Sequence, residues 1–390
     1  MKLEAARVYD DGVNDAPRTH VFVIGVGRYF HGEDGDEATA IGSGLGQLTS
    51  PPKSAVAVAE WFIEEFQNPD HPLGTVTMLL SDETPTVFNA PEGSKELPAA
   101  TWANVRLCLS DWHDAFQTHS GNMTVFYFCG HGVSLGQKAA LLLSDFGNED
   151  NAYESAIDID ALCGTMRNAQ PGKQVFIVDC CRTKADALYR NETNIGGRTL
   201  SIPPNVKQPG ALVRQFLLFP SIDGQKAFGL PDEVSVFTSC FLDAVRFAGF
   251  NDETGKWVST TALIFNAIDR LVECRLPADM LGRTVPTAMN SVSFEFNHID
   301  EPQTARSVVT IDPAVPWPTG VFTASCINNA DLAQQQLPSS RDDPYRCCVF
   351  EVEYGKWEFS GVPATTPPRI QPAQRTVTRP VAYVKLEVTP

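Results

Sequence analysis

Hydrophobic and polar positions up to about residue 299 alternate between short apolar runs and longer stretches with one apolar face. Such alternation is typical of an α/β sheet whose strands are mostly parallel, with helices as the crossovers. We therefore predict a mostly parallel six-stranded sheet flanked by helices. The predicted strands are 20–26, 76–82, 123–129, 174–180, 212–219 and 291–296, and the predicted helices begin at Ser54 and Thr101 or cover 157–170, 235–249 and 261–275.

The last 91 residues follow a different pattern. They contain 12 of the 28 prolines and no convincing helix, and their apolar positions alternate in runs such as CCVFEVEYGKWEF and VAYVKLEV. This pattern predicts a small β-rich domain over residues 300–390, after a first domain over residues 1–299. Its role is open: it would complete a substrate groove, bind a partner or cover a sheet edge.

Composition narrows the classes of partner. The chain has 390 residues, of which 43% are hydrophobic and 20% charged, and its formal net charge is −17. An excess of acids argues against nucleic acid or an anionic membrane as partner. The first residues lack the apolar segment of a signal peptide, and no run of 18 apolar residues occurs. We therefore expect a cytoplasmic protein.

The spacing of the ten cysteines and the motifs that the sequence lacks argue against zinc sites, phosphate loops and other classes of hydrolase. The cysteines lack the paired spacing of a zinc site, so we expect reduced thiols and no metal. The segment 42–46 has two Gly-x-Gly steps but no Lys-Ser/Thr, which favours a flexible turn over a phosphate loop. Motifs of serine hydrolases and zinc peptidases are absent from the sequence. No cofactor is predicted.

Two predicted strand ends carry chemistry. Strand 123–129 leads into Gly130-His131-Gly132, and strand 174–180 leads into Cys181. Neighbouring parallel strands joined by a right-handed crossover would place an imidazole beside a thiol. This is the arrangement that a cysteine nucleophile needs, because the imidazole raises the thiolate fraction and later protonates the leaving group. Successive strand residues point to opposite faces, so only one of Cys180 and Cys181 can face His131.

These segments resemble a known family. The sequence MTVFYFCGHG, followed 50 residues later by QVFIVDCCR, resembles the caspase and metacaspase superfamily of cysteine peptidases. The resemblance covers about residues 20–300 and implies the caspase fold, with His131 as the catalytic histidine and Cys181 as the nucleophile. It also implies an oxyanion hole formed by the amides of Gly132 and Cys181. The chain departs from the family after the thiol, where Arg182 and Thr183 replace a glycine-containing turn.

The resemblance also suggests a substrate preference. Asp179 stands where metacaspases have an Asp that receives a basic side chain in the S1 pocket, so we expect cleavage after Arg or Lys. Asp223 and one of Asp34 and Asp36 are weaker candidates for the same pocket. The alternative for Asp179 is a capping carboxylate that holds the cysteine loop. Short acidic loops such as the one at 33–37 are usually only solvated.

Two further segments have open interpretations. Residues 183–211 lie where caspases carry the linker between their subunits, so self-cleavage after Arg190 or Arg198 is one hypothesis, and an ordinary insertion is the other. The acids of 148–160 would either bind calcium or form a solvated helix entry.

The function predicted from the sequence is a caspase-like cysteine endopeptidase that acts on protein or peptide substrates. Resemblance to bacterial members that act in cell death or defence suggests regulation by processing or by an upstream protein activator. The alternative is a catalytically inactive scaffold that keeps the fold and binds a protein partner.

Overall fold

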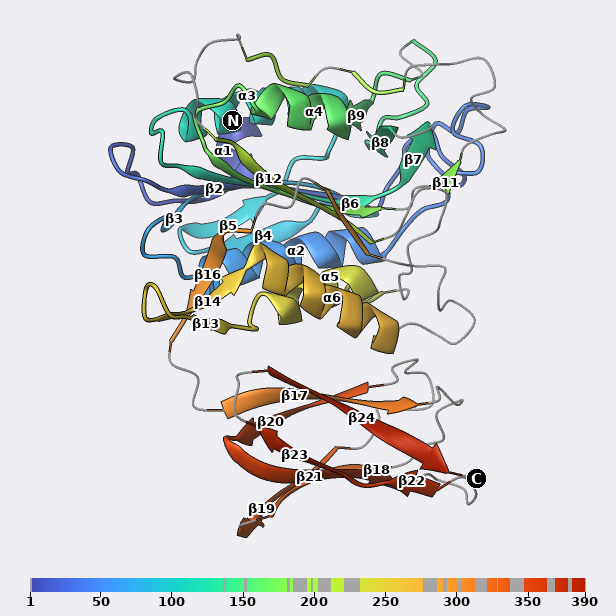
Figure 1. The fold of residues 1–390 in the computed structure, drawn as a ribbon. Helices are drawn as coiled ribbons and strands as arrows, with labels where there is room; N and C mark the ends of the chain where they lie inside the picture. The colour runs from blue at the N-terminus through green and yellow to red at the C-terminus, as the bar shows by residue number, and fades with distance from the viewer. Residues whose placement is uncertain are drawn as a thin grey trace. The chain divides into compact units, whose positions relative to one another are not determined.

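The computed structural model forms two compact units (Figure 1). Unit 1 comprises Met1–Leu242 and Thr284–Phe294, and unit 2 comprises Asp243–Arg283 and Glu295–Pro390. These units divide the chain at other points than residue 299, and the predicted domain boundary stays a prediction. The structure describes residues 2–135, 138–150, 153–180, 183–184, 195–197, 199–202, 212–220, 232–275, 286–289, 293–300, 304–312, 321–327, 329–336, 347–362, 369–377 and 381–389.

A seven-stranded sheet forms the centre of unit 1, in the order β1-β3-β2-β6-β10-β12-β15. Its five inner strands are parallel to one another, whereas the edge strands β1 and β15 are antiparallel. The mostly parallel sheet predicted from the sequence is thus confirmed. The strands are β1 Arg7–Asp10, β2 Thr19–Val26, β3 Leu73–Ser81, β6 Met123–Gly130, β10 Lys173–Cys180, β12 Arg214–Phe219 and β15 Thr287–Met289.

Helices cover both faces of this sheet, with α3 and α4 on one side and α2 on the other (Figure 1). Every residue of β2 and β6 is buried, which explains why these strands are continuous apolar runs rather than alternating ones. On the α3 side, the Phe22 ring packs against Trp112 at 5.6 Å between centroids and stacks on Phe126. The helices are α1 Lys2–Ala6, α2 Ser50–Glu64, α3 Trp102–Phe116, α4 Ile159–Met166, α5 Val236–Ala244 and α6 Thr261–Arg275.

The prediction that residues 291–296 form the last strand of this sheet is wrong. The antiparallel strand β15 pairs with β12, and β16 (Glu295–Ile299) pairs instead with β14 (Lys256–Thr260), which also pairs with β13 (Gly249–Asn251). Alternation of polar and apolar residues indicates a strand but does not identify the sheet that it joins.

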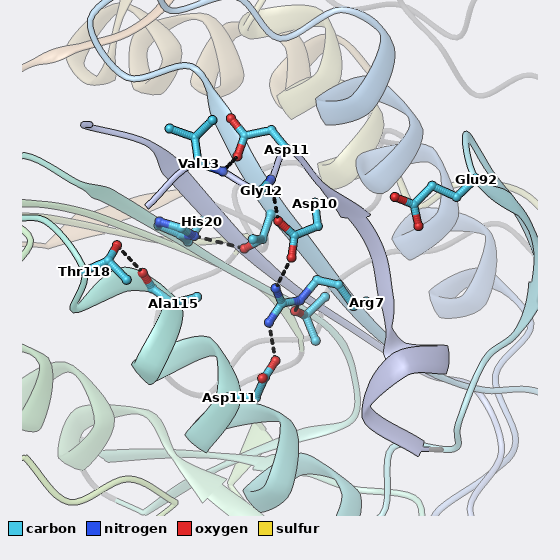
Figure 2. Close-up of polar contacts among 12 residues, drawn as sticks. Arg7, Asp10, Asp11, Gly12, Val13, His20, Glu92, Asp111, Ala115 and Thr118 are labelled. Atoms are coloured by element: carbon cyan, nitrogen blue, oxygen red, sulfur yellow. Dashed lines mark hydrogen bonds and ion pairs between the residues drawn. The ribbon is translucent and has the colours of Figure 1, made fainter. Parts of the chain in front are cut away.

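The edge strand β1 was missed because four residues are too short for a recognisable apolar run. It is held by Arg7, whose guanidinium donates to Thr77 Oγ1 at 3.1 Å and to Asp10 Oδ2 at 2.9 Å, and also pairs with Asp111 on α3 (Figure 2). One side chain therefore connects β1 to β3 and to the covering helix. With β1, the sheet has seven strands rather than the predicted six.

The helix starts follow local chemistry. Helix α2 begins at Ser50, before the predicted Ser54, because prolines at 51 and 52 suit a first turn in which no N–H donor is needed. Helix α3 begins directly after Thr101, close to the predicted start, and the structure adds that the Thr101 hydroxyl caps the helix by accepting from Asn104 N. Helix α4 begins later than predicted because residues 156–158 form strand β9, and Asp158 caps it by accepting from Ala161 N at 2.8 Å.

Two smaller sheets complete the described part of unit 1. One has the order β11-β7-β8-β9, and the other is the hairpin of β4 and β5. The bounds are β4 Val87–Ala90, β5 Gly93–Glu96, β7 Gly132–Leu135, β8 Lys138–Leu142, β9 Ala156–Asp158 and β11 Thr183–Lys184.

Unit 2 ends in two four-stranded sheets, β20-β17-β24-β22 and β19-β18-β21-β23. Both sheets contribute to one apolar core that includes Phe322, Phe350, Trp357 and Phe359. The prediction of a β-rich C-terminal region is confirmed. Its strands are β17 Thr304–Asp312, β18 Val321–Cys326, β19 Asn329–Gln336, β20 Cys347–Glu353, β21 Gly355–Val362, β22 Arg369–Gln371, β23 Ala373–Val377 and β24 Val381–Thr389.

Among the described residues, no helix has the length and apolar character needed to cross a membrane.

The cap of α4 gives a test of the fold. Replacing Asp158 with Ala should lower the free energy of unfolding by about 1 kcal/mol, because the Ala161 N–H loses its acceptor at the helix end. The measurement is equilibrium urea unfolding followed by tryptophan fluorescence. Asp158→Asn is the matched control, since the Asn side chain also accepts from the first turn. Equal stability of the Ala and Asn variants would contradict the cap.

Candidate active site

The candidate site lies where strands β6 and β10 end. These parallel neighbours pair in constant register up to Cys180 opposite Gly130. The following short strands β11 and β7 are also parallel, with Thr183 opposite Val133. Paired residues are 50 positions apart in sequence both in β10 with β6 and in β11 with β7. The two strand pairs therefore share one register. The structure thereby brings the chain that leaves β10 beside the chain that carries His131.

The side chain of His131 is held by a loop that follows β2. The imidazole Nε2 lies 2.8 Å from the carbonyl oxygen of Gly46. The backbone N–H of His131 donates to Tyr29 Oη at 2.6 Å. The Tyr29 ring also packs against the imidazole, with 4.8 Å between centroids. Because a carbonyl oxygen can only accept, Nε2 must carry the proton.

Electrostatics favour the neutral form of this ring. Burial lowers the pKa of His131, and the hydrogen bond to the Gly46 carbonyl opposes that change only in part. A neutral imidazole protonated at Nε2 has a lone pair at Nδ1. The ring can therefore take up a proton at Nδ1, as a general base does.

Sequence reasoning missed the acceptor for His131. It interpreted the segment 42–46 as a flexible turn, whereas the carbonyl of Gly46 orients the imidazole. The only hint in the sequence is the glycine at position 27, and the structure shows its reason, since a Cβ there would lie 2.4 Å from the carbonyl oxygen of Leu48. This close approach shows that the two ends of the loop meet where β2 ends, the side of a parallel sheet on which sites form.

Asp179 is buried rather than lining an open surface. One of its carboxylate oxygens accepts from the Thr238 hydroxyl at 2.6 Å and also from the Ser235 hydroxyl, both at the start of α5. Burial raises the pKa of Asp179, opposed by these hydroxyls and by the Cys129 thiol. The carboxyl therefore joins β10 to α5, and its predicted role in the S1 pocket stays a prediction.

The weaker S1 candidates on the loop after β2 lie in water. Asp34 and Asp36 are exposed, and Asp36 forms an ion pair with Arg28 at 2.9 Å. This agrees with the alternative of a solvated acidic loop.

Other predicted site residues have mixed outcomes. Gly132 is buried at the start of β7, opposite Leu141. Cys180 is 1% exposed and belongs to the apolar core, as expected for the cysteine that does not face the site. The remaining site residues lie outside the described part of the chain: Cys181, Asp223, Arg190 and Arg198.

Two of the acids considered for calcium have partners at a helix entry. Asp158 caps α4, and Asp160 accepts from the backbone N–H of Ala139 at 3.2 Å. Both contacts agree with the alternative of a charged helix entry.

Comparison with known proteins identifies the family. The model of the Caspase domain matches residues 94–296, which is more than half of the chain. The chain belongs to the caspase family. Members of this family are typically cysteine peptidases. The matched segment contains the ends of β6 and β10, whereas the loop that supplies Gly46 precedes it.

Two individual proteins are similar to this caspase-family chain. The uncharacterized protein y4kE of Sinorhizobium fredii (strain NBRC 101917 / NGR234) is 27% identical over 256 residues, or 58% of this chain and 70% of that protein. The crystal structure of caspase-1 from Spodoptera frugiperda superposes with a TM-score of 0.41 at 12% identity, covering 72% of this chain and 92% of that one.

The environment of His131 predicts its titration. Its protonation midpoint should lie below 6.5, the ordinary value, because burial disfavours the imidazolium ion. The unfolded chain binds this proton at a higher pH than the folded chain does. The free energy of unfolding is therefore not reduced by this group above pH 6.5, and it decreases as the pH falls below 6.5. Imidazole NMR signals followed against pH, and assigned with His131→Asn, measure the midpoint. A midpoint at or above 6.5 would contradict the prediction.

Proposed function

We propose that this chain is a cysteine endopeptidase in which Cys181 is the nucleophile and His131 is its acid and base. The observation that carries the proposal is the constant register of the two strand ends, with Cys180 opposite Gly130 and Thr183 opposite Val133. The Nε2–H tautomer of His131 supports it, because Nδ1 is then able to accept the thiol proton. Family membership supports the same chemistry.

The proposed reaction has two stages. The Cys181 thiol transfers its proton to Nδ1 of His131, and the sulfur attacks the carbonyl carbon of the scissile peptide bond. The imidazolium then protonates the departing amine, and an acyl-enzyme remains. Water, deprotonated by the same ring, hydrolyses the thioester and restores the thiol. Amides of Gly132 and Cys181 are the proposed donors to the oxyanion.

We further propose that the residue before the scissile bond is Arg or Lys, with Asp179 as the recognising group. Its partner across the strand pair is Cys129, two residues before His131, so the carboxyl belongs to the same strand ends as the imidazole. Burial raises the pKa of Asp179, and the hydroxyl donors Ser235 and Thr238 oppose that change by stabilising the charged form, which is the form that attracts a cation. The substrate class is therefore a protein or peptide with a basic residue.

Replacing each of the two adjacent cysteines with alanine, one at a time, tests which of them is the nucleophile. Cys181→Ala should lower kcat/KM on fluorogenic arginyl and lysyl peptides on the order of 10⁴-fold or more, because the covalent step is lost. Cys180→Ala should keep the activity, since that thiol belongs to the apolar core. Covalent labelling by an arginyl ketone, detected by mass spectrometry, reports the same thiol. The opposite pattern would refute the assignment, and a folded protein that neither cleaves nor labels would indicate the inactive scaffold.

Asp179→Asn tests the specificity. The variant should lose at least about tenfold in kcat/KM on arginyl and lysyl peptides relative to peptides with a neutral residue at that position, because the charge partner is removed. The measurement is a kcat/KM series on peptides that differ only there. If all peptides lose activity by the same factor, the carboxyl holds α5 and does not select the substrate.

A further inference from the structure

The loop between β2 and α2 is closed by one amide side chain. Gln47 Oε1 accepts from the backbone N–H of Tyr29 at 2.7 Å, and Gln47 Nε2 donates to the carbonyl of Tyr29 at 3.0 Å. The same Nε2 donates to the carbonyl of Glu33 at 2.8 Å. The amide thus pairs with both backbone groups of Tyr29 and with a third position of the loop.

The two residues that Gln47 joins are the two that hold His131. Gly46, its neighbour in sequence, provides the carbonyl that accepts from Nε2. Tyr29 provides the hydroxyl that accepts from the His131 backbone and the ring that packs on the imidazole. The Gln47 amide therefore links these two supports directly, through its own side chain.

Backbone hydrogen bonds also join the two arms of this loop and attach it to the sheet, including one from Glu33 N to the carbonyl of Leu45 at 2.8 Å. Gly27 N donates to the carbonyl of Ser81 at 2.7 Å, and Leu48 N donates to the carbonyl of Gly27 at 2.9 Å. Farther along the loop, Phe30 N donates to the carbonyl of Ser144 at 2.8 Å. None of these backbone bonds uses the Gln47 side chain, so we expect the loop to stay attached in a variant that lacks it and the loss to act on the position of Gly46 relative to Tyr29.

We propose that Gln47 is a positioning residue that keeps the imidazole of His131 in the Nε2–H tautomer. It does so by presenting the Gly46 carbonyl to Nε2 while the Tyr29 ring fixes the ring plane. Its effect on turnover rests on the proposed peptidase function, whereas its effect on the tautomer does not. The hydrogen bonds of the Gln47 amide among the described residues all go to loop backbone.

The consequence for catalysis follows from the tautomer. Without an aligned acceptor at Nε2, the neutral ring populates the Nδ1–H form as well, and that form has no lone pair at Nδ1 for the thiol proton. The chemical step then slows, while groups that bind the peptide are unchanged. We therefore expect kcat to fall about 10- to 100-fold and KM to change less than about twofold in Gln47→Ala.

The matched control is Gln117→Ala. The Gln117 amide also makes a donor and an acceptor contact, accepting from the Gln170 backbone at 2.9 Å and meeting the His113 ring at 3.1 Å, but at the end of α3. Loss of general stability would lower activity in both variants, whereas loss of positioning would affect only Gln47→Ala.

The experiment measures kcat, KM and the ¹⁵N chemical shifts of the His131 ring in the wild type and both variants of the full chain. We expect a single Nε2–H tautomer in the wild type and in Gln117→Ala, and a mixture in Gln47→Ala. Gln47→Glu is the second variant if the Ala variant does not fold, because it keeps the acceptor for Tyr29 N–H but loses both donated bonds when ionised.

The outcomes separate the two proposals. An unchanged tautomer together with wild-type kcat in the Gln47 variants would overturn the positioning role, as would an equal loss of kcat in Gln117→Ala. A wild-type protein without peptidase activity would overturn the proposed function, and the ¹⁵N shifts would still decide the role of Gln47.

Discussion

The parallel pairing of β6 and β10 is the constraint on which the site depends. Eight paired positions from Lys173 to Cys180 fix the register, and all but one of the β10 residues are buried. A shift by one residue would move Asp179 into the apolar core and turn Cys180 toward α5, so burial strongly disfavours any other alignment. The edge strands β1 and β15 carry none of the residues discussed for the site.

How much the sequence could predict depends on the kind of interaction. The central strands were recognised because burial on both faces requires apolar residues at every position. The start of α3 was recognised because its apolar residues, such as Trp102 and Val105, recur at helical spacing directly after Thr101. The start of α2 was placed wrongly at Ser54, whose hydroxyl accepts from Ser235 N, a partner 181 residues away that no local pattern reveals. The carbonyl of Gly46 was missed because every residue has one, and only the fold selects which carbonyl faces an imidazole.

The buried carboxyl of Asp179 illustrates two demands on one group. Ser235 and Thr238 donate to it from α5, and Tyr127 Oη lies 2.7 Å from the same Thr238 hydroxyl. Removing one member of such a buried hydrogen-bonded group lowers the free energy of unfolding, because the donor left behind has no partner and no contact with water. Attraction of a cationic side chain requires the ionised form, which the hydroxyl donors from α5 favour and burial disfavours, so both proposed roles depend on the same contacts.

The use of a main-chain oxygen to orient His131 affects how the protein can change over evolution. A carbonyl survives almost any exchange of amino acid at its own position, so single-residue replacement at 46 does not remove the group itself. The length of the connection between β2 and α2 is another matter, because one residue more or less would present a different peptide unit to the ring. Insertions and deletions, rather than substitutions, are therefore the changes that this part of the chain tolerates least.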